Sequence, residues 1–428
     1  GLALVENACE IAAMDSTIAS KTYYRLWRIA RRLWVRAALI STLAAPAALS
    51  ASSMAWLVPE SLSNVASADT LSSLLEVLAS SMLAVTIFSL SVIISARQSA
   101  SSQVTPRSHQ ILMEDRTTQN VLATFLGSFI YSLAGIIVLG TGLYEGAAVT
   151  VMLGFTLVVI ALVVIAILRW IDHLAELGSV SATTGKIERA AAVALDARQK
   201  LPCLGARPLT CGQLEVPERA ENLRAWETGY VQHIDLKALS KLAVSCDCNI
   251  YVVVQPGELV SPGEILVYFT ADLDEESLKR AFTLADRRVF EQDPRFGVIV
   301  LSEIAQRALS PGVNDPGTAI DVLTRLARVL GRYRDEADPA RKVRLPRVWM
   351  SAVTADELVR DAFDPIARDG AGSVEVQIRL QKTLGLLSDS GDNTMTKAAR
   401  AASARALEMA LPALQLEEHR ERITALAA

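Results

Sequence analysis

The chain has 428 residues, of which 51% are hydrophobic, and a formal net charge of -4. A positive mean hydropathy over this length argues against a uniformly soluble protein and indicates a membrane part joined to a soluble part. Because the chain has no basic excess and only 5% aromatic residues, it is not expected to bind nucleic acid.

Residues 1–36 are predicted to form a cytoplasmic and interfacial N-terminal segment. They lack a basic stretch followed by an apolar one near the start, so no signal peptide is expected. Between Tyr23 and Arg36, arginines are interleaved with Tyr and Trp side chains directly before an apolar stretch. This pattern is typical of a segment whose cations face lipid headgroups and whose aromatic rings lie at the water boundary.

Four apolar stretches follow, so residues 37–173 are predicted to be a four-helix transmembrane domain. A hydrocarbon core about 30 Å thick requires about 20 apolar residues in a helix, and these stretches reach that length. The first stretch is rich in Ala and Ser and contains Pro46, so it is expected to be largely covered by other helices. The four predicted helices are Ala37–Val58, Leu71–Ala96, Thr117–Tyr144 and Gly146–Leu168.

Charges beside these stretches predict the orientation of the chain. Basic residues precede the first helix, occur in the loop between the second and third, and follow the fourth. The two opposite loops contain Glu60, Asp69 and Glu145 but no Lys or Arg. Since cytoplasmic loops carry the excess of Lys and Arg, both termini are predicted to lie in the cytoplasm.

The second predicted helix carries several hydroxyl groups. In a bilayer such groups face other helices or water and avoid lipid. One interpretation is close packing, with each hydroxyl bonded to the carbonyl group four residues earlier. The other is a hydrophilic pore lining. The candidates for a pore lining are Ser81, Thr86, Ser89, Ser91 and Ser95.

After the membrane part, residues 174–226 are predicted to form a helical stalk and linker, and residues 227–428 a cytoplasmic α/β domain. Alternating stretches and two Pro-Gly-Glu turns, at Pro256 and Pro262, favour short strands in a small β-barrel or sandwich. Further elements are predicted as helices over 274–288, 298–309, 318–334, 356–366, 373–387 and 396–425, and as a strand within 342–354.

Two clusters rich in Pro and Gly are the best polar candidates in this domain. Their side chains Asp293, Arg295, Asn314 and Asp315 could bind an ion or a ligand, or pair with one another. The alternative is that they shape turns and cap helices. No glycine-rich phosphate loop, His-Glu-x-x-His or Gly-x-Ser-x-Gly motif is present, so the chain is not expected to be an enzyme.

The cysteines and the four histidines have no standard zinc spacing, so neither a metal nor a cofactor is expected. Thiols in the cytoplasm are expected to stay reduced, and buried ones to act as small hydrophobes. The five cysteines are Cys9, Cys203, Cys211, Cys246 and Cys248.

Several motifs resemble the DUF2254 family of predicted bacterial membrane proteins, over residues 20–385. They are the loop Ser101-Ser-Gln-Val-Thr-Pro-Arg, the run Glu114–Tyr131, Gly229-Tyr-Val-Gln-His-Ile-Asp, Asp293-Pro-Arg-Phe-Gly and Ala308-Leu-Ser-Pro-Gly-Val-Asn-Asp-Pro-Gly-Thr-Ala-Ile. The last two are the most specific, and Thr105 stands where the family has Ser. The resemblance implies a bacterial inner-membrane protein. It supplies no activity and no catalytic residues, because the function of the family is unknown.

Three functions fit this sequence. The first is a homo-oligomeric ion channel that prefers cations and whose cytoplasmic domain senses a ligand or an ion. The second is a membrane-anchored regulatory or scaffold protein without conduction, and the third is an enzyme that acts on a lipid or a small molecule. A proton-coupled transporter is disfavoured, because no charged residue lies in mid-helix.

A channel would need several protomers, because four helices are too few to enclose a water-filled path. Glu60, Asp69 and Glu145 would then concentrate cations at the outer mouth. The expected partners are further copies of the chain, membrane lipid and monovalent ions, and no nucleic acid.

Overall fold

The computed structural model describes residues 67–103, 105, 107, 116–141, 147–176, 179–209, 216, 217, 219–336 and 343–427. The first predicted membrane helix, Glu60, Glu145, Cys9 and Cys211 lie outside these residues. The described chain separates into two compact units, and the division along the sequence falls between Thr183 and Thr184. They are called here the membrane unit, residues 67–183, and the C-terminal unit, residues 184–427.

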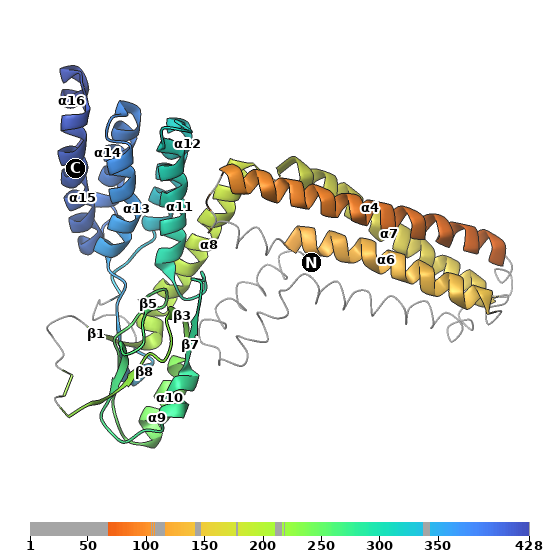
Figure 1. Cartoon of the computed structure of the whole chain (residues 1–428), viewed down its shortest axis with the longest axis horizontal. Coiled ribbons are helices and arrows are strands. Elements are labelled where there is room, and N and C mark those ends of the chain that lie inside the picture. The colour runs from red at the N-terminus through yellow and green to blue at the C-terminus, as the bar shows by residue number, and fades with distance from the viewer. Residues whose placement is uncertain are drawn as a thin grey trace. The chain divides into compact units, whose positions relative to one another are not determined.

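The membrane unit consists of three long helices (Figure 1). They are α4 (Ala68–Gln103), α6 (Arg116–Gly140) and α7 (Ala147–Glu176). Each contains a stretch long and apolar enough to cross a membrane. Three of the four predicted membrane helices are therefore confirmed as apolar helices of the required length, and the fourth falls on residues 37–58, outside the described part.

Close packing holds α4, α6 and α7 together. A Cβ added at Gly135 would overlap the ends of the Met152 and Leu75 side chains, one from each neighbouring helix. Of the apolar stretch in each helix, 56% is buried in α6, against 28% in α4 and 22% in α7. The middle helix therefore uses its small residues for contact, while α4 and α7 keep broad exposed faces.

The C-terminal unit contains two β-sheets. One has five strands in the order β1-β8-β4-β6-β2, and the other has three in the order β5-β3-β7. The strand β8 pairs in parallel with β1 and β4, while the other pairs are antiparallel. The strands are β1 (Ala206–Leu209), β2 (Glu221–Arg224), β3 (Gly229–Ile234), β4 (Ile250–Val252), β5 (Leu259–Val260), β6 (Ile265–Phe269), β7 (Phe282–Ala285) and β8 (Leu345–Ser351).

Both sheets contribute to one hydrophobic core, which α9 (Leu236–Ser245) and α10 (Glu275–Ala281) also help to form. The Pro-Gly-Glu turns follow β4 and β5, and Gly257 and Gly263 have φ angles of 93° and 97°. Only glycine adopts these angles readily, as the turn prediction requires. The combination of helices and sheets is confirmed, whereas a barrel or a sandwich stays a prediction.

Two predicted helices are wrong in their extent. The helix predicted over 396–425 is broken at residues 414–416 into α15 (Asn393–Ala413) and α16 (Glu417–Thr424). The sequence predicts a helix over 274–288, but α10 ends at Ala281 and the strand β7 follows at once. In β7, Phe282 and Leu284 are buried while Thr283 and Ala285 are half-buried, which is the two-residue alternation of a strand. Pairing with β3 therefore outweighs the local helical preference.

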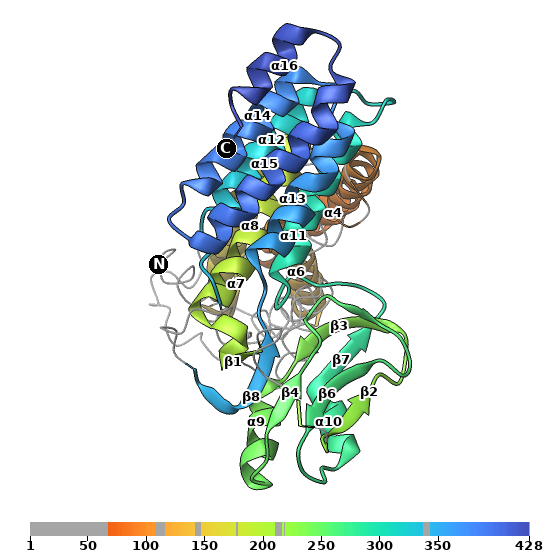
Figure 2. The ribbon, with the colours of Figure 1, turned by 90° about the vertical axis from the view of Figure 1, so that its left-hand side faces the viewer.

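The rest of this unit is a bundle of helices that stand side by side, with the sheets at one end of them (Figure 2). Contacts join α11 to α12 and α13, α15 to α13 and α14, and α12 to α14. The bundle helices are α11 (Pro294–Leu309), α12 (Pro316–Leu330), α13 (Ala355–Asp369), α14 (Val374–Ser388), α15 (Asn393–Ala413) and α16 (Glu417–Thr424).

The helix α8 (Val180–Lys200), which follows the membrane helices in the chain, is bound tightly to this bundle. Glu188 accepts hydrogen bonds from Arg325 Nη1 at 2.7 Å and Arg328 Nε at 2.6 Å. Burial opposes the charge of Glu188, but these arginines still hold the pKa of its carboxyl below its usual range. Most of the predicted stalk helix is thus part of the compact C-terminal unit.

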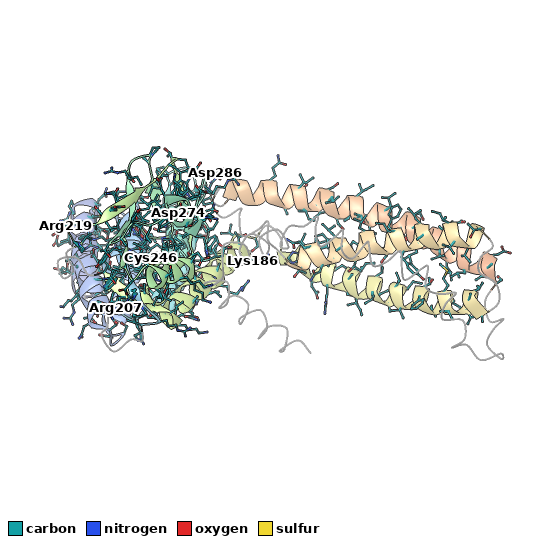
Figure 3. The ribbon with its side chains drawn as sticks, turned by 90° about the horizontal axis from the view of Figure 1, so that it is seen from below. Lys186, Arg207, Arg219, Cys246, Asp274 and Asp286 are labelled. Atoms are coloured by element: carbon teal, nitrogen blue, oxygen red, sulfur yellow. The ribbon has the colours of Figure 1, made fainter. Side chains whose placement is uncertain are left out.

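Three cysteines lie among the described residues. Cys203 and Cys248 are buried, whereas Cys246 is exposed just after α9 (Figure 3). Burial raises the pKa of the Cys203 thiol to about 12. Cys203 is therefore protonated at neutral pH, and its Sγ donates a weak hydrogen bond to Glu336 Oε2 at 3.8 Å.

Candidate functional site

The structure separates the four polar candidates of the C-terminal unit into two pairs. Asp293 and Arg295 lie at the start of α11, while Asn314 and Asp315 lie in the turn after its end. The 16 residues of α11 place these ends roughly 24 Å apart. The four side chains therefore do not form one site.

Asn314 and Asp315 shape the turn before α12. Asn314 has a φ angle of 49°, a conformation that Asn tolerates better than most residues. Asp315 caps α12, because its Oδ1 accepts a hydrogen bond from the Thr318 amide at 3.0 Å. Both side chains are exposed, and the interpretation as a turn and a cap describes them fully.

Asp293 is the buried centre of a polar network between the sheets and the bundle. It is only 1% exposed and caps α11, with its Oδ1 accepting from the amides of Arg295 and Phe296. Its Oδ2 accepts from Arg288 Nε at 2.8 Å. Burial raises the pKa of this carboxyl although Arg288 opposes the shift, so burial is the larger effect.

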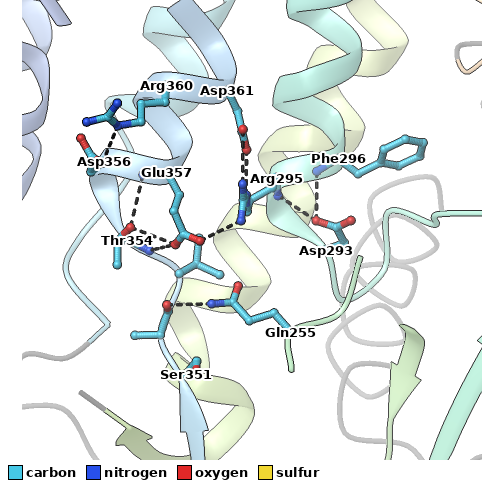
Figure 4. A network of polar contacts seen from close by, with 12 residues as sticks. Gln255, Asp293, Arg295, Phe296, Ser351, Thr354, Asp356, Glu357, Arg360 and Asp361 are labelled. Carbon is cyan, nitrogen blue, oxygen red and sulfur yellow. Dashed lines mark hydrogen bonds and ion pairs between the residues drawn. The ribbon is translucent and has the colours of Figure 1, made fainter. Parts of the chain in front are cut away.

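Arg295 fastens the start of α11 to α13 (Figure 4). Its Nη1 donates to Glu357 Oε1 and its Nε to Asp361 Oδ2, each at 2.7 Å. Glu357 also completes a capping box with Thr354 at the start of α13. The two helices are therefore joined where both begin.

The first Pro-Gly-Glu turn brings the sheets to the same network. A Cβ added at Gly257 would overlap the carboxylate of Asp293, so only glycine lets this turn approach. Burial raises the pKa of the next residue, Glu258, which faces Arg295, Glu357 and Arg288. Gln255, one residue before the turn, donates from Nε2 to the carbonyl oxygen of Ala352 at 3.0 Å.

A second buried group, which the sequence analysis missed, lies where α8 ends. Arg198 Nε donates to Glu336 Oε1 at 2.8 Å, and both side chains are 1% exposed. The other oxygen of Glu336 accepts from the Val353 amide at 3.2 Å. These two residues are 138 positions apart, so no local pattern in the sequence indicates that they pair.

These networks balance charge and join elements that are distant in the sequence. Within the described ranges, no three His, Cys, Asp or Glu side chains are placed to hold a metal ion. Asp293, Glu357 and Asp361 each accept hydrogen bonds from an arginine. This region therefore connects the sheets to the helix bundle through ion pairs and hydrogen bonds.

The five hydroxyl candidates of α4 do not share one face. Ser89 is fully buried, whereas Ser81, Ser91 and Ser95 are exposed and Thr86 is half-buried. The hydroxyls of Thr86 and Ser91 donate to the carbonyl oxygens of Met82 and Ile87, four residues earlier, at 2.6 and 3.0 Å.

Ser81 likewise donates to the carbonyl oxygen of Val77. This back-bonding is what the packing interpretation predicts, and it leaves each hydroxyl oxygen free to accept a further bond. Of the three acidic candidates for an outer mouth, the described one is Asp69, which is exposed in the first turn of α4.

Comparison with known proteins gives a family and no activity. The family described as "Predicted membrane protein (DUF2254)" matches residues 30–385. Uncharacterized proteins of Mycobacterium bovis and Mycobacterium tuberculosis are 29% identical over 262 residues, which cover 57% of this chain and 48% of each relative. The chain therefore spans about half the length of the curated relatives it matches. No solved structure matches it.

Proposed function

We propose a function for this chain, which belongs to the DUF2254 family of predicted membrane proteins. The proposed function is that of a homo-oligomeric ion channel with a cytoplasmic regulatory domain. The proposal assigns no catalytic step to the chain. Each protomer supplies few membrane helices, so a water-filled path requires several copies around an axis.

The observation that carries this proposal is the difference between the exposed faces of α4 and α7. On α7 the exposed side chains in mid-helix are large and apolar, for example Leu157, Leu162 and Ile165. On α4 large apolar side chains such as Ile87 and Phe88 are also exposed, but exposed serines lie among them, with Ser81 near mid-helix and Ser91 further along. Lipid covers the first kind of face well, while hydroxyls in a bilayer favour another helix or water.

The four exposed serines on the central and inner part of α4 are Ser80, Ser81, Ser91 and Ser95. Ser91 and Ser95 are one helical turn apart and lie on the same face. This part of α4 supports contact with further protomers or with a hydrated path. Ser89 is buried inside its own bundle and is a packing residue in this proposal.

We further propose a membrane topology and a cellular location for the chain. Residues 37–58 form a fourth crossing of the bacterial inner membrane, and both termini lie in the cytoplasm. The basic residues that flank the helices support this orientation. Glu60, Asp69 and Glu145 then lie at the outer side, where they attract cations.

A regulatory or scaffold protein without conduction is the second candidate, and one observation favours it. The hydroxyls of Ser81, Thr86 and Ser91 donate to carbonyl oxygens of their own helix, which lowers the cost of exposing them to lipid. In that case the C-terminal unit, with its joined sheets and bundle, carries the function.

Ion flux decides between the two candidates. The purified full chain is reconstituted into liposomes under sodium, potassium and chloride gradients, beside Ser91→Leu and Gly154→Leu. Gly154 is exposed on α7 with open space around it, so its variant adds the same side chain to a lipid-facing surface.

A channel predicts cation flux that Ser91→Leu reduces several-fold and Gly154→Leu leaves unchanged. An absence of flux in every gradient, from a folded oligomer, would reject conduction and favour the scaffold.

A further inference from the structure

The chain makes an unusual turn where it passes from α8 into the sheet. Cys203 and Leu204 have φ angles of 49° and 53°, and Gly205 follows at 89°. These three left-handed residues lead directly into β1, which pairs with β8. Both Cys203 and Leu204 are buried, so the turn lies inside the fold.

This turn concentrates the backbone strain of the described chain. The other two non-glycine residues with positive φ among the described positions are Asp247 and Asn314, both exposed and of types that tolerate this conformation. Cys and Leu have no such tolerance, because their Cβ approaches the following carbonyl oxygen. Strain of this kind persists only where the surrounding structure enforces it.

Glu336 is a buried group that contacts the turn at two atoms of Cys203, the amide nitrogen and Sγ. Its carboxylate accepts from the amide of Cys203 at 3.4 Å, in addition to Arg198 and the amide of Val353. One buried carboxylate thus binds the end of α8, the strained turn and Val353, two residues after β8.

The same place carries two further unfavourable features. Arg198 and Glu336 have both lost their water, a cost that the attraction of the pair offsets only with good geometry. In addition, Arg198 Nη1 is buried without a hydrogen-bond partner among the described residues. The strained turn, the buried ion pair and the buried Nη1 of Arg198 therefore lie together where α8 leads into the sheet. Each of them raises the free energy of the folded chain.

We propose that Glu336 and the turn at Cys203 and Leu204 form a latch, a strained connection that Glu336 holds closed and whose opening releases α8 from β1 and β8. When the contacts of Glu336 break, the turn relaxes out of the left-handed region, and this relaxation favours opening. Because α8 is the segment through which the chain leaves the membrane helices, the latch sets whether movement of α8 reaches the sheet. This inference does not depend on conduction.

Hydrogen exchange of the full chain in detergent micelles tests the latch. Glu336→Gln keeps the shape of the side chain but removes its charge. It is expected to speed exchange in residues 201–209 and 345–353 by about tenfold or more, with α13–α15 unchanged. Asp196→Asn is the matched control, because Asp196 lies on the same helix and its ion pair with Arg332, which follows α12, is partly exposed. It is expected to leave these segments unchanged.

An equal increase throughout the C-terminal unit would show that the ion pair only supports global stability, and would overturn the proposal. So would unchanged exchange in residues 201–209.

A second pair of variants tests the strain by itself. Cys203→Gly and Cys203→Ala both remove the thiol, but only glycine adopts the left-handed conformation without strain. Exchange in residues 201–209 is expected to be slower in the glycine variant than in the alanine variant. Equal or faster exchange in the glycine variant would show that no strain is stored there.

Discussion

The membrane unit and the C-terminal unit differ in how far their polar contacts reach along the chain. In the membrane unit, the hydroxyls of Thr86 and Ser91 bond to carbonyl groups four residues earlier in the same helix. In the C-terminal unit, Arg295 reaches residues 62 and 66 positions away, and Arg198 reaches Glu336 across 138 positions.

This difference decides what holds each unit together. The bonds within α4 satisfy its hydroxyls but fix no neighbour, so α4 depends on the fit of its surface. Gly135 shows that fit, since Leu75 and Met152 both lie against it. The helices α6 and α7 are also joined by Tyr131, whose hydroxyl bonds to Thr156 Oγ1 at 3.0 Å. In the C-terminal unit, ion pairs between distant elements add a second constraint, and they specify which element lies beside which.

The largest expected effect on stability comes from adding a methyl group at a tightly packed glycine, and each unit contains one such glycine. A Cβ at Gly297, on α11, would lie 2.5 Å from Ala191 Cβ and 2.8 Å from its backbone Cα, neither of which can turn away. Gly297→Ala is therefore expected to lower the free energy of unfolding by about 2–3 kcal/mol.

At Gly135 the obstructing atoms are the ends of flexible side chains. Gly135→Ala is expected to cost less than about 1 kcal/mol. Thermal unfolding in micelles measures both variants. A larger loss at Gly135 than at Gly297 would show that the membrane helices are the more rigidly packed region.

A smaller loss of stability is expected when a polar contact is removed, and the loss should differ between contacts that join two helices and bonds within one helix. Arg295→Ala removes the bonds to Glu357 and Asp361, which are partly exposed, and is expected to cost about 1–2 kcal/mol. Ser91→Ala removes a bond within one helix and is expected to cost less than about 0.5 kcal/mol. Denaturant unfolding measures the first, and thermal unfolding in micelles the second. Equal losses would contradict the contrast between the units.

The smallest effect depends on pH. Burial raises the folded-state pKa of Glu258, so the folded chain binds this proton more tightly than the unfolded chain. The penalty is therefore present at neutral pH and disappears as the pH falls through that pKa. Glu258→Gln is expected to raise the Tm by roughly 1–2 °C at pH 7, with the gain shrinking on acidification.

Asp286→Asn, at an exposed carboxyl, is the control for this change in charge. Scanning calorimetry at pH 7 and pH 5 measures both variants. A lower Tm for Glu258→Gln at pH 7 would mean that Arg288 and Arg295 need the Glu258 charge.

The same contrast explains which features the sequence predicts. Asp293 and Asp315 cap helices through amides two or three residues away, so a short motif indicates them. The membrane stretches are equally local, because length and composition suffice.

The pairs Arg198–Glu336 and Arg295–Asp361 depend on how distant elements meet, and the sequence does not indicate them. The strand β7 was predicted as helix for the same reason, since its partner β3 lies about fifty residues earlier. The polar face of α4 is predicted only in part by the sequence. The hydroxyls are visible in the sequence, but only the packing shows that Ser89 turns inward and Ser91 outward.

The most direct test of conduction along α4 is the current through planar bilayers that contain the Ser91→Cys variant, before and after a charged thiol reagent. The unsubstituted chain gives the background from its own cysteines, and Leu157→Cys on the exposed face of α7 is the control. The proposed channel predicts a cation current that the reagent reduces in Ser91→Cys and leaves unchanged in Leu157→Cys. A current insensitive to modification at Ser91, or no current from any folded oligomer, would contradict it.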